Sequence, residues 1–168
     1  MTTYNVDAML ERMATELNQF ISERSIDDPM ITGIHTGGVW IAERLHKLLN
    51  LSSEISTLNI SFYRDDFTRI GVHPQVLPSR IKDSVEGRSI ILVDDVLYTG
   101  RTIRAALNEI FDYGRPRLIK LAVLVDRGGR ELPFQADVVG THMQLTENQQ
   151  VKLTGPSPLE LSVIMENE

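Results

Sequence analysis

Two adjacent carboxylates, Asp94 and Asp95, are followed within a few residues by the turn Thr99-Gly100-Arg101-Thr102. A carboxylate can accept hydrogen bonds from two neighbouring sugar hydroxyls, and a glycine turn lets the backbone approach a phosphate closely. The two threonine hydroxyls add donors for phosphate oxygens. This spacing predicts a site for a sugar phosphate. Each feature by itself would equally fit polar residues at the end of a strand and a turn that caps a helix.

The residues around this segment predict a strand before it and a helix after it. Ile90 to Val93 is a continuous apolar run, which is typical of a parallel strand buried on both faces. After the turn, apolar residues recur at helical spacing until Gly114 and Pro116, which favour a helix end. A second apolar run from Leu118 to Val125 completes a strand-helix-strand unit. Such units form parallel sheets, whose ligands bind at the carboxyl ends of the strands.

A similar arrangement occurs closer to the N-terminus. Apolar residues from Val6 to Ile21 recur at helical spacing, and Met30 to Ile34 then reads as a short strand. The turn Thr36-Gly37-Gly38 follows this strand, and a helical pattern resumes until Asn50. A glycine turn at a helix N-terminus suits a diphosphate group and its metal ion, although such a turn is more often only a turn.

The remaining stretches predict a further strand, a long loop and a small C-terminal cap. Alternation at residues 57–62 predicts a half-buried strand, but residues 63–87 are too long for a routine connection and predict a flexible loop. Cations in that loop could neutralise a diphosphate, although for each of them a solvated surface position is the simpler interpretation: Arg64, Arg69, Arg80 and Lys82. After residue 126, shorter strands near residues 137–139, 150–153 and 161–164 predict a small cap over the sheet.

Bulk composition limits the classes of protein to consider. The 168 residues fit a single domain, and the absence of cysteine excludes disulfides and thiolate chemistry. The chain shows neither a secretion signal nor an apolar run long enough to span a membrane, so we expect a cytoplasmic location. A net charge of -6 lowers the expectation of nucleic-acid binding, because that binding depends on a surplus of Lys and Arg.

The segment from Ile90 to Thr102, taken as a whole, closely resembles the signature with which type I phosphoribosyltransferases bind 5-phosphoribosyl pyrophosphate (PRPP). The resemblance implies an α/β fold with a central parallel sheet flanked by helices and a small C-terminal hood, formed mainly by residues 126–168. It also implies that PRPP or a nucleotide is bound by the turn Thr36, Gly37 and Gly38 and by this segment: Ile90, Ile91, Leu92, Val93, Asp94, Asp95, Val96, Leu97, Tyr98, Thr99, Gly100, Arg101 and Thr102.

Further motifs resemble one branch of this family, the pyrimidine operon regulators that are also uracil phosphoribosyltransferases. These motifs are residues 62–66 (FYRDD), 91–104 (ILVDDVLYTGRTIR) and 121–128 (LAVLVDRG). The resemblance implies conversion of uracil and PRPP to UMP and pyrophosphate, with Mg²⁺ held through PRPP near the two aspartates. It also implies nucleotide-dependent attenuation through leader RNA, and assembly into homodimers or larger homo-oligomers. The residues implied are Asp94, Asp95 and Arg64 for catalysis, and Val125, Asp126 and Arg127 for uracil. A salt bridge at the sheet end is an equally good interpretation of Arg127.

Two single positions and one stretch depart from the pattern of this branch. Gly37 stands where the branch usually has arginine, Gly129 stands where it has histidine, and residues 141–146 replace its Lys-Asn-Ile-Pro-Thr-Ser stretch. The loss of a cation at position 37 predicts weaker PRPP binding. A nucleotide-sensing regulator with little or no transferase activity, acting through RNA, DNA or a protein, is therefore a second hypothesis. A phosphoribosyltransferase for another base is a third.

Overall fold

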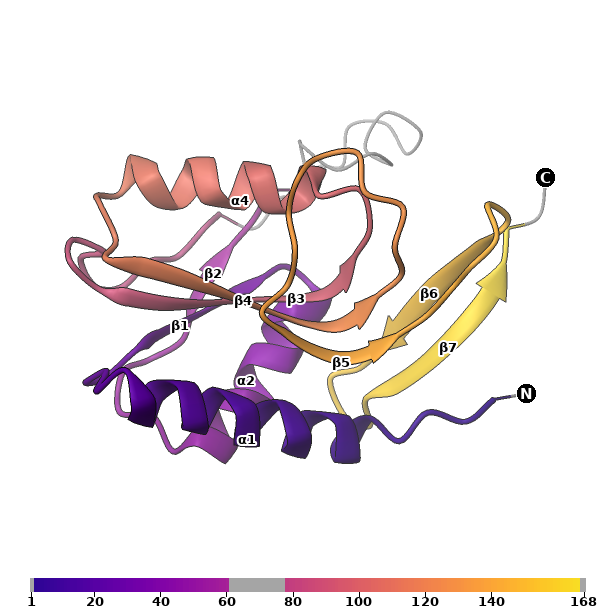
Figure 1. Cartoon of the computed structure of the whole chain (residues 1–168), viewed down its shortest axis with the longest axis horizontal. Coiled ribbons are helices and arrows are strands. Elements are labelled where there is room, and N and C mark those ends of the chain that lie inside the picture. Colours follow the sequence, from indigo (N-terminus) through magenta and orange to yellow (C-terminus); the bar gives the residue numbers. More distant parts are fainter. Residues whose placement is uncertain (1, 61–77, 167–168) are drawn as a thin grey trace.

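A five-stranded parallel sheet forms the centre of the molecule (Figure 1). The computed structural model describes residues 2–60 and 78–166. The strands follow the order β2-β1-β3-β4-β5, and every neighbouring pair is parallel. Their bounds are β1 Met30–Ile34, β2 Ser56–Leu58, β3 Ser89–Leu97, β4 Leu118–Asp126 and β5 Val138–His142.

Helices cover both faces of this sheet (Figure 1). α1 (Val6–Glu23) and α2 (Gly37–Leu49) lie on one face, and α4 (Arg101–Asp112) lies on the other. α1 begins after Asn5, whose side-chain oxygen accepts a hydrogen bond from the N–H of Ala8 at 3.0 Å. This bond satisfies one of the free donors of the first turn.

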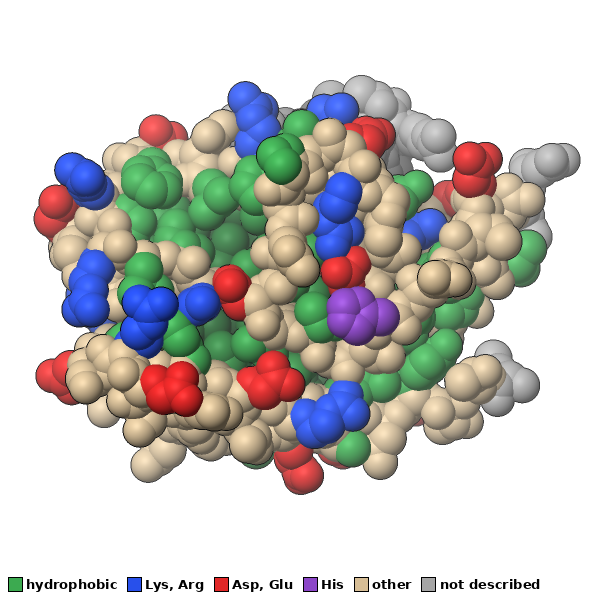
Figure 2. Space-filling model, viewed as in Figure 1, with side chains coloured by type: hydrophobic (Ala, Val, Ile, Leu, Met, Phe, Trp, Pro, Cys, Tyr) green, Lys and Arg blue, Asp and Glu red, His purple; other side chains and the backbone are tan. Residues whose placement is uncertain are grey.

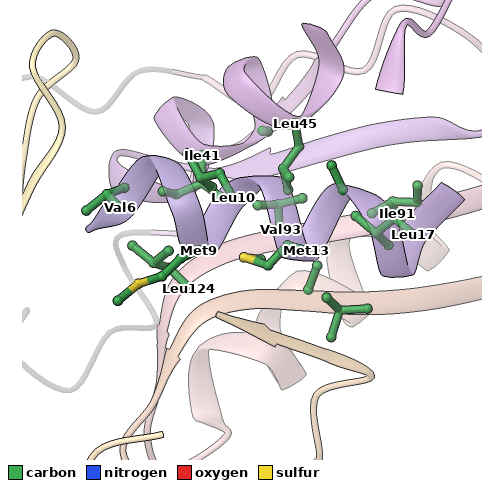
Figure 3. Packing of buried hydrophobic residues seen from close by; sticks show 14 of the residues in the cluster. Val6, Met9, Leu10, Met13, Leu17, Ile41, Leu45, Ile91, Val93 and Leu124 are labelled. Atoms are coloured by element: carbon green, nitrogen blue, oxygen red, sulfur yellow. The ribbon is translucent and has the colours of Figure 1, made fainter. Parts of the chain in front are cut away.

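The hydrophobic core is divided by the sheet into two clusters. Ile91 and Val93 of β3 belong to the cluster under α1 and α2, whereas Ile90 and Leu92 belong to the cluster under α4. Alternation along a strand explains this division, because successive side chains point to opposite faces. Figure 3 shows the first cluster, in which apolar side chains of α1 meet those of α2 and the strands: Val6, Met9, Leu10, Met13, Leu17, Ile41, Leu45 and Leu124. Burial of each such side chain contributes about 1.5–3 kcal/mol.

The C-terminal part of the chain corrects one expectation. The strand expected near residues 137–139 does not belong to a separate cap, because β5 pairs with β4 as the edge of the central sheet. Only β6 (Gln149–Thr154) and β7 (Glu160–Met165) form a separate antiparallel hairpin, which lies beyond the carboxyl ends of the strands (Figure 1). The backbone of Gly155 lies against the indole of Trp40, so the hairpin turn packs on α2.

Several predicted elements are confirmed, with changed limits. β1, β4, α1, α2 and α4 occur where the apolar patterns predicted them. β3 continues past the expected end at Val93 to Leu97, so Asp94 and Asp95 lie inside the strand. β2 covers only the start of the strand expected at residues 57–62, the end of which lies outside the described residues. Within the described residues, no helix is both long and apolar enough to cross a membrane.

Candidate functional site

The first turn of α2 rests directly on β3. A Cβ atom built on Gly38 would lie 2.6 Å from the carbonyl oxygen of Val93, and one built on Gly37 would lie 2.8 Å from Cγ of Asp95. At Gly38 the neighbour is backbone and leaves no room for a side chain, whereas at Gly37 the neighbour is the Asp95 side chain, which a larger residue would have to displace. The structure therefore brings together the glycine turn and the paired carboxylates, which the sequence predicted as separate parts of one site.

The two carboxylates are held by the backbone that follows each of them. Oδ1 of Asp94 accepts a hydrogen bond from the N–H of Asp95 at 2.9 Å, and Oδ1 of Asp95 accepts one from the N–H of Val96 at 2.9 Å. Asp94 is almost fully buried, whereas Asp95 is partly exposed. Their position near the carboxyl end of a central strand is where ligands bind in open α/β sheets.

The predicted phosphate turn connects β3 to α4. Gly100 is the N-cap of α4 and has a φ of 93°, a backbone conformation that favours glycine. The hydroxyl oxygen of Thr99 accepts a hydrogen bond from the N–H of Arg101 at 3.2 Å, while the Thr99 carbonyl accepts bonds from the N–H groups of Glu131 and Leu132. The turn is thus tied to the chain that follows β4. As predicted, it sits at a helix N-terminus, where the helix dipole favours an anion.

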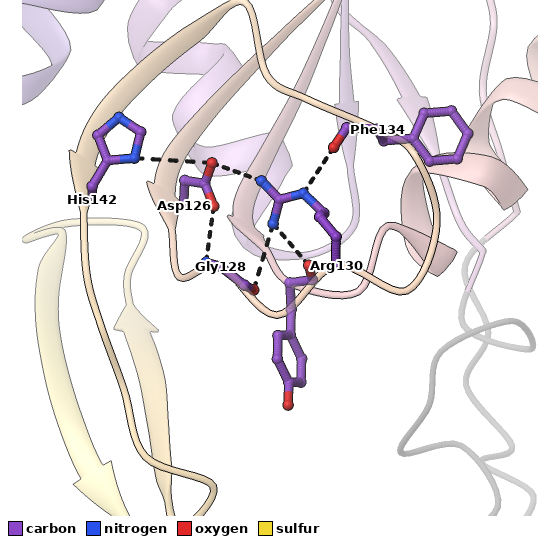
Figure 4. Close-up of polar contacts among 6 residues, drawn as sticks. Asp126, Gly128, Arg130, Phe134 and His142 are labelled. Atoms are coloured by element: carbon purple, nitrogen blue, oxygen red, sulfur yellow. Dashed lines mark hydrogen bonds and ion pairs between the residues drawn. The ribbon is translucent and has the colours of Figure 1, made fainter.

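Hydrogen bonds of Arg130 hold residues 127–134, the segment after β4, in place (Figure 4). Arg130 donates hydrogen bonds to Oδ2 of Asp126 at 2.7 Å, to the Tyr98 carbonyl at 2.8 Å and to the Phe134 carbonyl at 2.8 Å. The N–H of Gly128 donates to Oδ1 of Asp126 at 3.0 Å. Both carboxylate oxygens of Asp126 are therefore occupied, and the segment is fastened to the loop that follows β3.

The network also changes the acidity of Asp126. Burial raises the pKa of this carboxyl group, but hydrogen bonds from Arg130 and Gly128, with the charges of Arg130 and His142, lower it more, so the pKa falls below its ordinary value. Nδ1 of His142 lies 3.9 Å from Oδ2 of Asp126. Asp126 is therefore a stable anion near neutral pH.

The three residues implied for uracil have different surroundings. The side chain of Val125 is fully buried in the core, so only its backbone faces the end of the sheet. Asp126 is occupied by the network. Arg127 stacks on the ring of Tyr98, with 3.9 Å between its Cζ and the ring centroid, and this contact replaces the salt bridge that was the other interpretation. The three residues lie beside β3, because Val96 pairs with Val125.

Residues 141–146 begin beside this segment. Thr141 pairs with Val125 and His142 with Asp126 across β5 and β4, so the departure from the branch pattern lies next to the residues where uracil is expected.

The cations predicted in the long loop are divided by the structure. Arg64 and Arg69 lie outside the described residues. Lys82 forms an exposed ion pair with Glu54, which precedes β2, and the backbone of Arg80 bonds to Thr57 in β2. Because Glu54 precedes β2, this ion pair places Lys82 toward the amino end of the sheet, away from the carboxylates of β3. In the described parts of the chain, no group of three or more His, Asp or Glu side chains could hold a metal ion.

Sequence reasoning missed the role of Arg130. Only its position four residues after Asp126, in a glycine-rich turn, could have indicated an ion pair.

Comparison with known proteins shows the family to which the chain belongs. The model of the phosphoribosyl transferase domain family matches residues 5–157. The chain is 63% identical to the bifunctional protein PyrR of Nitrosococcus oceani, over 95% of this chain and 91% of that protein. This chain belongs to the phosphoribosyltransferase family, in its PyrR branch. A PyrR protein of Pseudomonas paraeruginosa is 52% identical over 96% of this chain and 95% of its own length.

Solved phosphoribosyltransferases share the fold. The hypoxanthine phosphoribosyltransferase of Trypanosoma cruzi superimposes with a TM-score of 0.71 at 19% identity, over 95% of this chain and 91% of that chain. The enzyme of Staphylococcus aureus gives a TM-score of 0.63 at 18% identity, over 84% of this chain and 77% of its own. The predicted α/β phosphoribosyltransferase fold is confirmed.

Proposed function

We propose that this PyrR-family protein transfers the 5-phosphoribosyl group of PRPP to N1 of uracil, giving UMP and pyrophosphate, and regulates pyrimidine genes in response to nucleotides. The observation that supports the proposal best is the contact of the α2 turn with the carboxylates of β3, beside the phosphate turn. One ligand that carries a diphosphate, a ribose and a phosphate matches these three neighbouring parts.

Each part has a chemical role in this proposal. Thr36, Gly37 and Gly38 receive the diphosphate, Asp94 and Asp95 hold the ribose hydroxyls, and residues 99–102 bind the 5-phosphate. The segment at Val125 to Arg127 receives uracil, with Arg127 as its side-chain donor. Arg64 joins the site as a pyrophosphate-side cation, a role that stays a prediction.

The reaction is a displacement at the anomeric carbon with positive charge developing on the sugar. The new bond forms from N1 of uracil, the bond to pyrophosphate breaks, and the N1 proton leaves to solvent. The protein contributes mainly position and charge, because the carboxylates orient the ribose and the N–H groups of α2 face the departing anion.

Magnesium would enter this site with PRPP. The ion would be held through PRPP, near the carboxylates of Asp94 and Asp95, whose hard oxygens suit a neighbouring Mg²⁺. When bound with PRPP, the ion would neutralise charge on the leaving pyrophosphate.

A second function, nucleotide sensing without transfer, is favoured by the surroundings of Gly37. Where the branch has arginine, this chain places the carboxylate of Asp95 against the glycine. Without the arginine, no cation at residue 37 offsets the charge of Asp95 beside the pyrophosphate position, which disfavours PRPP more than a nucleotide monophosphate.

The regulatory half of the proposal names leader RNA as partner and a homodimer or larger homo-oligomer as the assembly. On the face that Figure 2 shows, Lys and Arg side chains are interleaved with Asp and Glu, and hydrophobic side chains gather between α4 and α1. The hydrophobic surface suits contact between copies of the chain. RNA binding, the cytoplasmic location and the single-domain organisation remain predictions.

The decisive experiment measures uracil-dependent release of pyrophosphate from PRPP with Mg²⁺. We expect activity in the natural chain and a loss of roughly 100-fold or more in Asp94→Asn/Asp95→Asn, since each charge-assisted hydrogen bond contributes about 1.5–3 kcal/mol. Absence of activity in the natural chain, together with UMP binding, would leave the sensing function alone.

The role of position 37 needs a paired control. Gly37→Arg restores the cation of the branch but must displace Asp95, whereas Gly37→Ala only displaces it. Higher activity in Gly37→Arg than in Gly37→Ala would identify the charge as the missing element. Equal losses would identify the occupied space as the cause.

A further inference from the structure

Tyr98 connects the sugar-phosphate half of the site to the segment after β4. It follows the last residue of β3, and its ring lies against the guanidinium of Arg127 at 3.9 Å. Its backbone carbonyl accepts a hydrogen bond from Arg130 at 2.8 Å. A residue of the PRPP segment therefore contacts Arg127, where uracil is expected, and also Arg130, which follows it.

Gly129 makes room for this ring. A Cβ atom built on Gly129 would lie 2.5 Å from Cε2 and 3.0 Å from Cδ2 of Tyr98, and the φ of Gly129 is 77°. Any side chain at position 129 would have to displace the ring. The ring of Tyr98 thus occupies space that the histidine of the branch would need at position 129.

The stack fixes Arg127 on one side and leaves a donor without a partner. The N–H of Arg127 donates to the Leu97 carbonyl at 3.1 Å, which places the residue beside the end of β3. Nε of Arg127 is buried and has no hydrogen-bond partner within the described residues. Native proteins rarely keep a buried donor unpaired without a role, and a guanidinium fixed on an aromatic face still presents its N–H groups along its edge.

We propose that Tyr98 is a positioning residue for the base, whose ring holds Arg127 so that its edge donates hydrogen bonds to a carbonyl oxygen of a pyrimidine. This inference deepens the proposed function and rests on it, because it requires uracil at residues 125–127. The donors offered to the base are the terminal N–H groups of the guanidinium, because Nε itself is buried. Tyr98 acts through Arg127 and needs no bond of its own to the base.

The proposed role of Tyr98 affects the binding of one ligand and not of another. Ribose 5-phosphate uses only the carboxylates and the phosphate turn, whereas UMP also uses the stacked arginine. The ratio of the two affinities therefore reports the stack, and a general loss of structure would lower both affinities together.

The test is calorimetric binding of UMP and ribose 5-phosphate to the full chain and its variants. We expect Tyr98→Ala to weaken UMP binding roughly 2- to 30-fold, the range of a cation–π contact, and to leave ribose 5-phosphate unchanged. Tyr98→Phe keeps the ring and should bind both ligands as the natural chain does. Gly129→Ala displaces the ring without removing a contacting side chain and should reproduce the UMP-selective loss.

Two further variants complete the design. Tyr98→Ala should add nothing to the loss of UMP affinity in Arg127→Gln, because the ring acts through that arginine. Tyr113→Ala removes a tyrosine of similar exposure, 46% against 42% for Tyr98, at the far end of α4, and should change neither affinity.

The outcomes that overturn the inference are distinct from failure of the proposed function. A natural chain that binds UMP no better than ribose 5-phosphate would remove the uracil site, and this inference with it. A natural chain that prefers UMP, with an unchanged preference in Tyr98→Ala or with equal losses for both ligands, would overturn the role of Tyr98 alone.

Discussion

The α2 turn and the segment after β4 both lie near the carboxyl end of the sheet, where we propose that the ligand binds, but different forces hold them. Gly38 lies on the backbone of β3 because it has no side chain, and the contact is one of close packing. The segment after β4 is held by the charge and hydrogen bonds of Arg130. The first region should therefore be sensitive to added volume and the second to removed charge.

The largest effect is expected from added volume at Gly38. A methyl group there meets the Val93 carbonyl at 2.6 Å, and backbone atoms yield less readily than side chains. We expect Gly38→Ala to lower the free energy of unfolding by about 3 kcal/mol, as overpacking does, measured by urea denaturation.

The matched control is Gly128→Ala, in the second region. Gly128 has a φ of 72° but nothing within 4 Å of a built Cβ, so only the left-handed conformation opposes alanine. A cost of about 1 kcal/mol is expected. Equal costs for the two variants would remove close packing as the distinctive property of the α2 turn.

Removal of charge at Arg130 should have the next largest effect. Arg130→Gln removes the arginine ion pair of Asp126, whose side chain is only 12% exposed. We expect a loss of about 2 kcal/mol, or roughly 4–8 °C in Tm, by thermal denaturation. If Tm were unchanged, charge could not be what holds this segment.

The acidity of Asp126 gives a smaller, pH-dependent effect. Because its pKa is lowered in the folded chain, its contribution to stability is full above the unfolded value of about 3.9 and is lost as pH falls through the lower folded value. As pH falls from about 5 through the lowered folded pKa, Tm should therefore fall more steeply in the natural chain than in Asp126→Asn. Parallel curves would contradict this assignment.

The smallest effect is expected at Arg101 and Glu131, which join α4 to the same segment. Their side chains are 50% and 51% exposed, so water screens the ion pair. Glu131→Gln should change the free energy of unfolding by less than about 1 kcal/mol. A larger change would show that charge holds the outer surface of the segment as well as its inner side.

The elements of the fold were largely predictable because their apolar patterns are strong. Ile90 to Val93 and Leu118 to Val125 are continuous apolar runs, and each became a central strand. The convergence of the glycine turn, the carboxylates and the phosphate turn followed from the rule that ligands bind at the carboxyl ends of parallel strands. The signature segment was sufficient to identify the family.

What failed depended on contacts between distant residues. β5 mixes polar and apolar residues, so its sequence did not distinguish an edge strand from a cap. The sequence showed only that Gly37 lacks the arginine of the branch, whereas the structure also places the Asp95 side chain against it. The contact of Gly129 with Tyr98 joins residues 31 positions apart, and no local pattern encodes it.

The pairing of β1 with β3 also constrains when the site can form during synthesis. Met30 pairs with Ile90, and the α2 turn needs β3 beneath it, so this half of the site must wait until the end of β3 has left the ribosome. Such long-range parallel pairing folds slowly compared with local helical contacts. A nascent chain released before the end of β3 would expose the apolar faces of α1 and α2 and depend on chaperones for its survival.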